Sequence, residues 1–105
     1  MKAIYKVPNH TPIRCKIPNT LNALQSMVQG HIEVLELKRG VDLIVNEMGV
    51  LENSPLNMVL WFQEDKLEIP IYGTMLFVSA EGEDFCSLTE AQAKYAFDVA
   101  ESGVV

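Results

Sequence analysis

The order of the short apolar segments along the chain constrains its fold most strongly. Segments that alternate in polarity, or that are apolar throughout, predict strands at residues 2–7, 12–17, 31–37, 42–46, 69–73 and 74–80. Apolar residues at helical spacing predict one helix between Thr20 and Gly30 and another between Thr89 and Gly103. Because strands and helices do not alternate strictly, we predict an α+β fold. It has a mostly antiparallel or mixed sheet of about five strands, with two helices packed on it.

Cap signals locate the ends of the two helices. Asn19 or Thr20 is expected to cap the first helix, since a short side-chain oxygen accepts a hydrogen bond from a free backbone N–H. Gly30 is expected to end that helix in the left-handed conformation. Thr89 and Gln92 match the capping box of the second helix.

Turn signals and alternation define the strands further. Lys38-Arg39-Gly40 separates residues 31–37 from 42–46 and predicts an antiparallel hairpin. Within residues 12–17, Arg14 and Lys16 alternate with apolar neighbours. This predicts a half-buried strand with one wet, basic face.

The second half of the chain contains one clear strand and two less certain segments. Residues 74–80 are apolar almost throughout and predict a central strand. Residues 57–62 are equally compatible with a helical turn and a buried strand, and a short strand is expected at residues 50–52. Pro70 cannot donate a ladder hydrogen bond, which suits an edge strand.

Length and composition indicate one domain, residues 1–105, in which 49% of residues are hydrophobic. The formal net charge of -6 is unevenly distributed. Residues 1–45 contain six basic and three acidic side chains, whereas residues 46–105 contain two basic and eleven acidic ones. Such an acidic half disfavours direct nucleic-acid binding. It is either a solubilising surface or a face that meets a basic partner, as in a DNA mimic.

Signals for export or for a membrane span are not found. The N-terminal segment lacks the apolar run of a signal peptide, and no apolar stretch reaches the ~20 residues that span a bilayer. Cys15 and Cys86 form no CxxC motif and do not make a disulfide scaffold. We therefore expect a protein of a reducing cytosol, without a membrane partner.

Familiar catalytic and metal-binding patterns are also missing. No GxSxG elbow, GxGxxG or GxxxxGKS motif occurs, and His10 and His31 lack the spacing of metal ligands. Glu81, Glu83 and Asp84 lack the regular spacing of a calcium loop. We expect no cofactor, no metal and no familiar enzyme class.

Candidate binding residues cluster in residues 46–57, where three asparagines occur with a glycine and a proline. Asparagine offers a donor and an acceptor on a short arm, which suits recognition of a base or ribose, although it equally suits turns that bond their own backbone. Gly73-Thr74 allows close approach of a ligand or simply makes a bend. Arg14 and Arg39 are candidate anion clamps or isolated surface charges. The candidate ligand-binding residues are Asn46, Glu47, Asn53, Asn57, Gly73, Thr74, Arg14 and Arg39.

A set of short motifs resembles a known family. The chain carries, in order, Leu21-Asn22-Ala23-Leu24-Gln25, Gly30, Ile32-Glu33-Val34, Asn46-Glu47-x-Gly49, Pro55-Leu56-Asn57, Ile71-x-Gly73-Thr74 and Asp84-Phe85-x-Ser87-Leu88-Thr89. This pattern resembles a family of short proteins of unknown function encoded by phages, plasmids and conjugative elements. The resemblance implies an accessory protein of a mobile genetic element that acts in a bacterial cytoplasm, and it implies no particular activity.

Three functional hypotheses follow. The first is an anti-defence binding protein, homo-oligomeric, that sequesters a small nucleotide-like ligand. The alternative is an acidic inhibitor of DNA-mimic type that blocks a host defence protein, supported by the charge of residues 46–105. The third is an unfamiliar enzyme that degrades such a signal.

Overall fold

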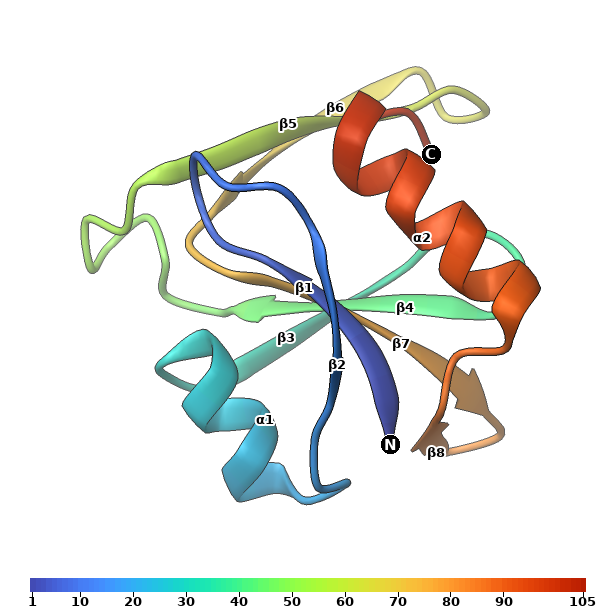
Figure 1. The fold of residues 1–105 in the computed structure, drawn as a ribbon. Coiled ribbons are helices and arrows are strands. Elements are labelled where there is room, and N and C mark those ends of the chain that lie inside the picture. Colours follow the sequence, from blue (N-terminus) through green and yellow to red (C-terminus); the bar gives the residue numbers. More distant parts are fainter.

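The chain forms one antiparallel sheet with a helix on each face, and a separate two-stranded sheet above it (Figure 1). The computed structural model describes residues 1–105. Six strands make the main sheet in the order β2-β1-β7-β4-β3, with β8 also paired to β7. They are β1 (Lys2–Lys6), β2 (Ile13–Lys16), β3 (Ile32–Glu36), β4 (Val41–Asn46), β7 (Met75–Glu81) and β8 (Asp84–Cys86). Every strand pair is antiparallel, which confirms the predicted α+β fold.

Strand β7 is the centre of the sheet. It pairs with β4 along one edge, and β1 and β8 follow each other along the other. Residues Met75 to Ser79 are all buried, because both faces of this strand are covered. A strand covered on both faces reads as a continuous apolar run, so the predicted central strand at residues 74–80 is confirmed.

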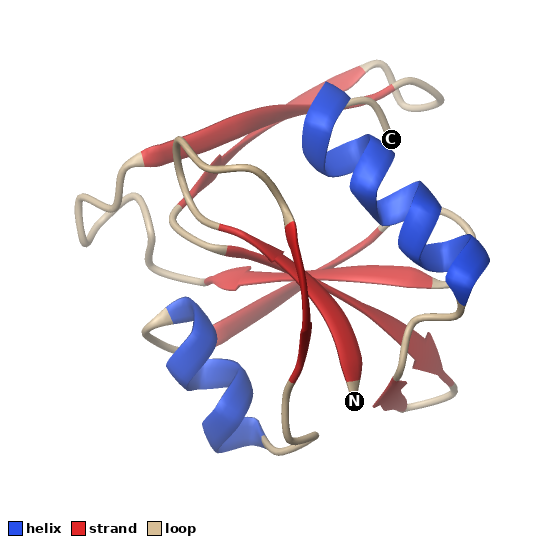
Figure 2. Ribbon diagram, in the orientation of Figure 1, coloured by secondary structure: helices blue, strands red, loops and turns tan.

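The two helices lie on opposite sides of the main sheet (Figure 2), and each covers its own hydrophobic core. On one face, α1 (Leu21–Val28) packs Leu24 and Val28 against Ile44 and Leu76. On the other, α2 (Glu90–Ser102) and the small sheet cover a larger core of 14 buried residues that includes Phe77. Alternate residues of β7 thus serve different cores.

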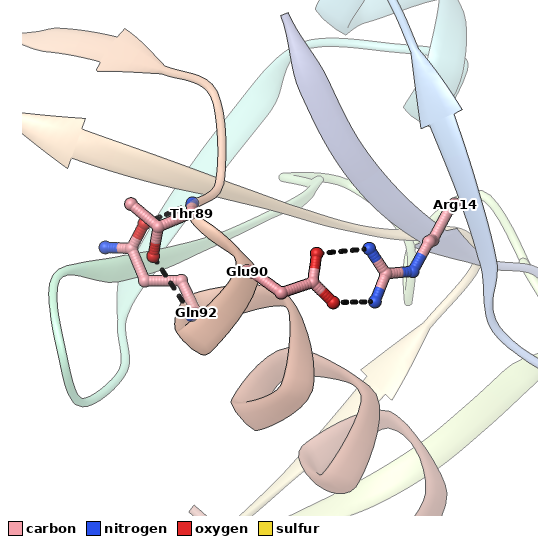
Figure 3. Close-up of polar contacts among 4 residues, drawn as sticks. All are labelled: Arg14, Thr89, Glu90 and Gln92. Carbon is pink, nitrogen blue, oxygen red and sulfur yellow. Dashed lines mark hydrogen bonds and ion pairs between the residues drawn. The ribbon is translucent and has the colours of Figure 1, made fainter.

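The helix caps agree with prediction except at one end. Thr20 caps α1, and Thr89 with Gln92 forms the capping box of α2 (Figure 3), in which the Thr89 N–H donates to Gln92 Oε1 at 2.9 Å. The residue that ends α1 in the left-handed conformation is Gln29, with φ 61°, so the prediction of Gly30 in that role was wrong. Gly30 instead leaves room for the side chain of Asn46, since a Cβ at residue 30 would lie 2.7 Å from Asn46 Nδ2.

The structure of the small sheet decides between the alternatives left for the second half of the chain. Residues 57–62 belong to β5 (Leu56–Phe62), which pairs with β6 (Leu67–Tyr72). The strand expected at residues 50–52 is not formed, because a hydrogen bond from the Glu52 N–H to the Met48 carbonyl closes a turn there. None of the helices has the length and apolar character needed to cross a membrane.

Candidate functional site

The largest cavity of the protein lies between the β1–β2 hairpin and the start of α2. It has a volume of about 580 Å³. The segment just before α2 is tied to β1, since the Lys2 N–H donates to Ser87 Oγ at 2.8 Å and the Leu88 N–H donates to the Lys2 carbonyl at 3.0 Å. The lining residues are Lys2, Ala3, Ile4, Arg14, Cys15, Lys16, Leu88, Thr89, Glu90 and Ala93.

Strand register gathers three cations on the cavity side of the hairpin. Lys2 lies directly opposite Lys16, and Ile4 lies directly opposite Arg14. Opposite residues of an antiparallel pair share a face, as do residues two apart on a strand, so all four point toward α2. Cys15 belongs to the other face, where it packs against the α1 core and burial raises the pKa of its thiol.

The Lys2–Lys16 pair is electrostatically unfavourable as it stands. Like charges directly opposite each other destabilise a strand pair. The two ion pairs of the chain, Arg14–Glu90 and Lys38–Glu64, include neither lysine. Neither lysine therefore has an ion-pair partner where it lines the cavity.

Arg14 reaches from β2 to Glu90, the first residue of α2, and both residues line the cavity (Figure 3). The guanidinium donates to both carboxylate oxygens, at 2.8 and 3.1 Å. These hydrogen bonds lower the pKa of Glu90 and raise the pKa of Arg14. Both side chains are largely in solvent, so the pair contributes little stability. It does show that this arginine presents its donors in the geometry that a carboxylate or phosphate needs.

Charge and polarity divide the cavity into two walls. Ile4, Leu88 and Ala93 are buried and form the apolar wall. Three basic residues and one acidic residue line the rest, in a chain whose net charge is -6. The protein thus concentrates positive charge at one concave site, which favours an anion that also has an apolar part.

Asn46, the leading candidate from the sequence, is a buried structural residue. Its Nδ2 donates to the carbonyls of Val28 and Gln29, each at 3.2 Å, and its Oδ1 accepts from the Met48 N–H at 2.7 Å. Nδ2 also lies 3.3 Å from a Glu52 carboxylate oxygen. This amide joins the end of α1 to the loop after β4.

Asn57 is used in a similar way. Its Nδ2 donates to the carbonyls of Lys6 and Gly73, both at 2.8 Å, and its Oδ1 accepts from Lys6 Nζ at 2.6 Å. Partial burial lowers the pKa of this lysine. Gly73 takes a φ of 82°, so it makes a bend, and Thr74 follows it as a half-buried residue before β7.

The remaining candidates are dispersed. Asn53 is an exposed turn residue with φ 56°, and Glu47 is exposed in the same loop. Arg39 lies in the β3–β4 turn with its guanidinium 5.7 Å from the centre of the Tyr95 ring. The structure therefore does not bring the eight predicted residues into one cleft, and only Arg14 lines the large cavity.

Sequence reasoning missed Lys2 and Lys16 as site residues. The alternation of β2 did place Arg14 and Lys16 on one wet face. The missing information was the register that sets Lys2 against Lys16, and the position of α2 above them.

Together, the fold and the cavity define a small antiparallel α+β protein with a cationic cleft on an otherwise acidic chain. The family model described as a domain of unknown function, DUF3846, matches residues 1–101, so the chain belongs to that family. This agrees with the resemblance to a family of unknown function. No curated protein and no solved structure matches the chain.

Proposed function

We propose that this protein binds a small nucleotide-like anion in the cavity between β1–β2 and α2. The observation that carries the proposal is the unpaired Lys2–Lys16 pair facing the cavity. A phosphate that bridges the two ammonium groups would replace their repulsion with charge-assisted hydrogen bonds. The apolar wall of Ile4, Leu88 and Ala93 would receive the base or ribose.

The biological role in this proposal is sequestration. A cavity of about 580 Å³ lies within the range of roughly 300–1,000 Å³ that small-molecule sites occupy. The resemblance to proteins of phages and conjugative elements supports a setting in which a bacterial defence signal is the ligand. Such a protein would act in the host cytoplasm by lowering the free concentration of that signal.

Calorimetry with AMP, ADP-ribose, cyclic AMP and adenosine tests the proposal. We expect the phosphate-bearing compounds to bind and adenosine to bind at least about tenfold more weakly, since a hydrogen bond to a charged group contributes roughly 1.5–3 kcal/mol. Lys16→Gln should weaken AMP binding by a similar factor. Lys38→Gln, which removes a lysine outside the cavity, is the matched control.

If no phosphate compound gives a heat of binding, while circular dichroism shows that the chain is folded, the proposal is overturned. Mass spectrometry of the same mixtures provides a second readout. Intact ligand after incubation supports sequestration, whereas a released product would support the enzyme hypothesis.

A second candidate function, the blocking of a host protein, is supported by the outer face of β5–β6. Trp61 is 37% exposed there and lies directly opposite Glu68. Val59, two residues before Trp61 on β5, and Val104, the bridge partner of Trp61, are also exposed. Glu64 and Asp65 occupy the adjoining turn. An exposed tryptophan among carboxylates suits a basic partner surface with an apolar centre.

Affinity purification from a host lysate tests this second function. A specific host protein should co-purify at low salt, and Trp61→Asp with Glu68→Lys should abolish its retention. Glu83→Gln, in the distant β7–β8 turn, makes the same change of net charge as the double variant and is its control. Equal retention by the double variant and the control would argue against a role for this face.

A further inference from the structure

The loop between β4 and β5, residues 47–55, displays the two most exposed large hydrophobic side chains of the protein. Leu51 is 74% exposed and Val50 is 63% exposed. Leaving such side chains in water forfeits the free energy that their burial would contribute. Their neighbours in the loop, Glu47 and Glu52, are exposed carboxylates.

This loop is braced by several internal contacts. The Ser54 N–H donates to the Gly49 carbonyl at 2.9 Å, and Glu52 N–H donates to the Met48 carbonyl at 2.9 Å. Gly49 lies so close to β6 that a Cβ would be 3.0 Å from the Tyr72 carbonyl oxygen. Asn46 anchors the start of the loop through its buried amide. These contacts brace the loop while Val50 and Leu51 are exposed, and a braced segment loses less conformational freedom on docking.

The chemistry of the loop matches that of the cationic cavity. The loop tip has an apolar centre between two carboxylates, and the cavity has an apolar wall beside Lys2, Arg14 and Lys16. The loop extends from the end of β4, whereas the cavity lies at the start of α2 and the β1–β2 hairpin, on the other side of the molecule (Figure 1). One chain therefore cannot fill its own cavity with its own loop.

We propose that the loop of residues 47–53 in one copy docks into the cationic cavity of a second copy, with Leu51 on the apolar wall. Such a contact joins two different surfaces, so it propagates head to tail into a ring or an open chain of copies. We expect a contact between one loop tip and one cavity to be weak and to depend on salt, because it would bring carboxylates against cations. It shares the cavity of the proposed function but does not require the ligand, and a bound nucleotide would compete with the loop.

Sedimentation velocity of the full chain over a concentration series at low salt tests the proposal. The unmodified chain should form species larger than a monomer. Leu51→Asp should raise the dissociation constant of this self-association at least tenfold. Leu67→Asp is the matched control, since Leu67 is 49% exposed on β6 and lies outside the loop. Lys2→Glu with Lys16→Glu should weaken association from the cavity side.

Mixing the two defective chains gives the sharpest result. The Leu51→Asp chain keeps a normal cavity, and the doubly substituted lysine chain keeps a normal loop. Their mixture should form a 1:1 dimer and nothing larger, because only one productive contact remains. A chain that stays monomeric at all concentrations, or association that Leu51→Asp leaves unchanged, would overturn the proposal.

The same variants separate this proposal from the proposed function. The Leu51→Asp chain should bind AMP at least as tightly as the unmodified chain does, since its own cavity is intact and no loop competes for it. Loss of association with retained AMP binding supports both proposals. AMP binding in a chain that never associates would overturn the docking proposal alone.

Discussion

Replacing Asn46 with leucine is expected to lower the free energy of unfolding by about 3 kcal/mol. Leucine is similar in size but cannot hydrogen-bond, so the carbonyls of Val28 and Gln29 and the Met48 N–H would lose their partner. A buried polar group left without a partner costs about 1–3 kcal/mol, and relaxation of the exposed loop offsets part of the total. Urea denaturation followed by circular dichroism measures the change by linear extrapolation.

Asn22→Leu provides the matched control for this substitution. Asn22 lies on the exposed side of α1, and its side chain has no hydrogen-bond partner, so its replacement should change stability by less than about 0.5 kcal/mol. Equal losses in the two variants would show that the amide of Asn46 does not brace the loop. Amide hydrogen exchange should also become faster at Met48 in the Asn46→Leu chain, because that N–H loses its acceptor.

Replacing Gly103 with alanine is expected to cost about 2–4 kcal/mol. Gly103 ends α2 at φ 76°, a conformation that costs other residues about 1–2 kcal/mol. A Cβ there would also lie 2.8 Å from the Val59 carbonyl oxygen. This is a backbone atom of β5, and the Gly103 carbonyl in turn accepts from the Trp61 N–H at 2.7 Å, so neither partner moves away freely. Thermal and urea denaturation measure the loss.

Gly82→Ala separates the two causes of that loss. Gly82 also has a positive φ, 62°, but a Cβ there would meet nothing within 4 Å. Its replacement should cost only the conformational part, about 1–2 kcal/mol. If the two alanine variants are equally stable, the close contact between α2 and β5 contributes nothing.

Local signals in the sequence were sufficient for most of the fold. The capping box of Thr89 and Gln92 and the Lys38-Arg39-Gly40 turn depend on neighbouring residues, and both were predicted. The assignment of Gly30 failed because a long-range contact with Asn46 uses that glycine for space. The strand predicted at residues 12–17 was expected to bury its apolar side, but Ile13 on that side is 45% exposed because β2 is an edge strand.

The candidate site was much harder to predict than the fold. Asn46 and Asn57 have the chemistry of ligand-binding residues, but short amides satisfy nearby backbone equally well, and here they do so. The cation pair of Lys2 and Lys16 depends on a strand register across fourteen positions, and Glu90 joins Arg14 from 76 positions away. No local pattern encodes such long-range placement.

The place of β7 in the sheet has a consequence for the order of assembly. The β1–β2 and β3–β4 hairpins each pair locally, but only β7 joins them, through Ile4 opposite Phe77 and Leu43 opposite the same phenylalanine. During synthesis, the two hairpins cannot join into one sheet before residues 75–81 have left the ribosome. Until then, their apolar faces stay uncovered. A nascent chain that stops before that strand has no continuous sheet on which α1 can settle, so folding of this protein is a late and concerted event in its synthesis.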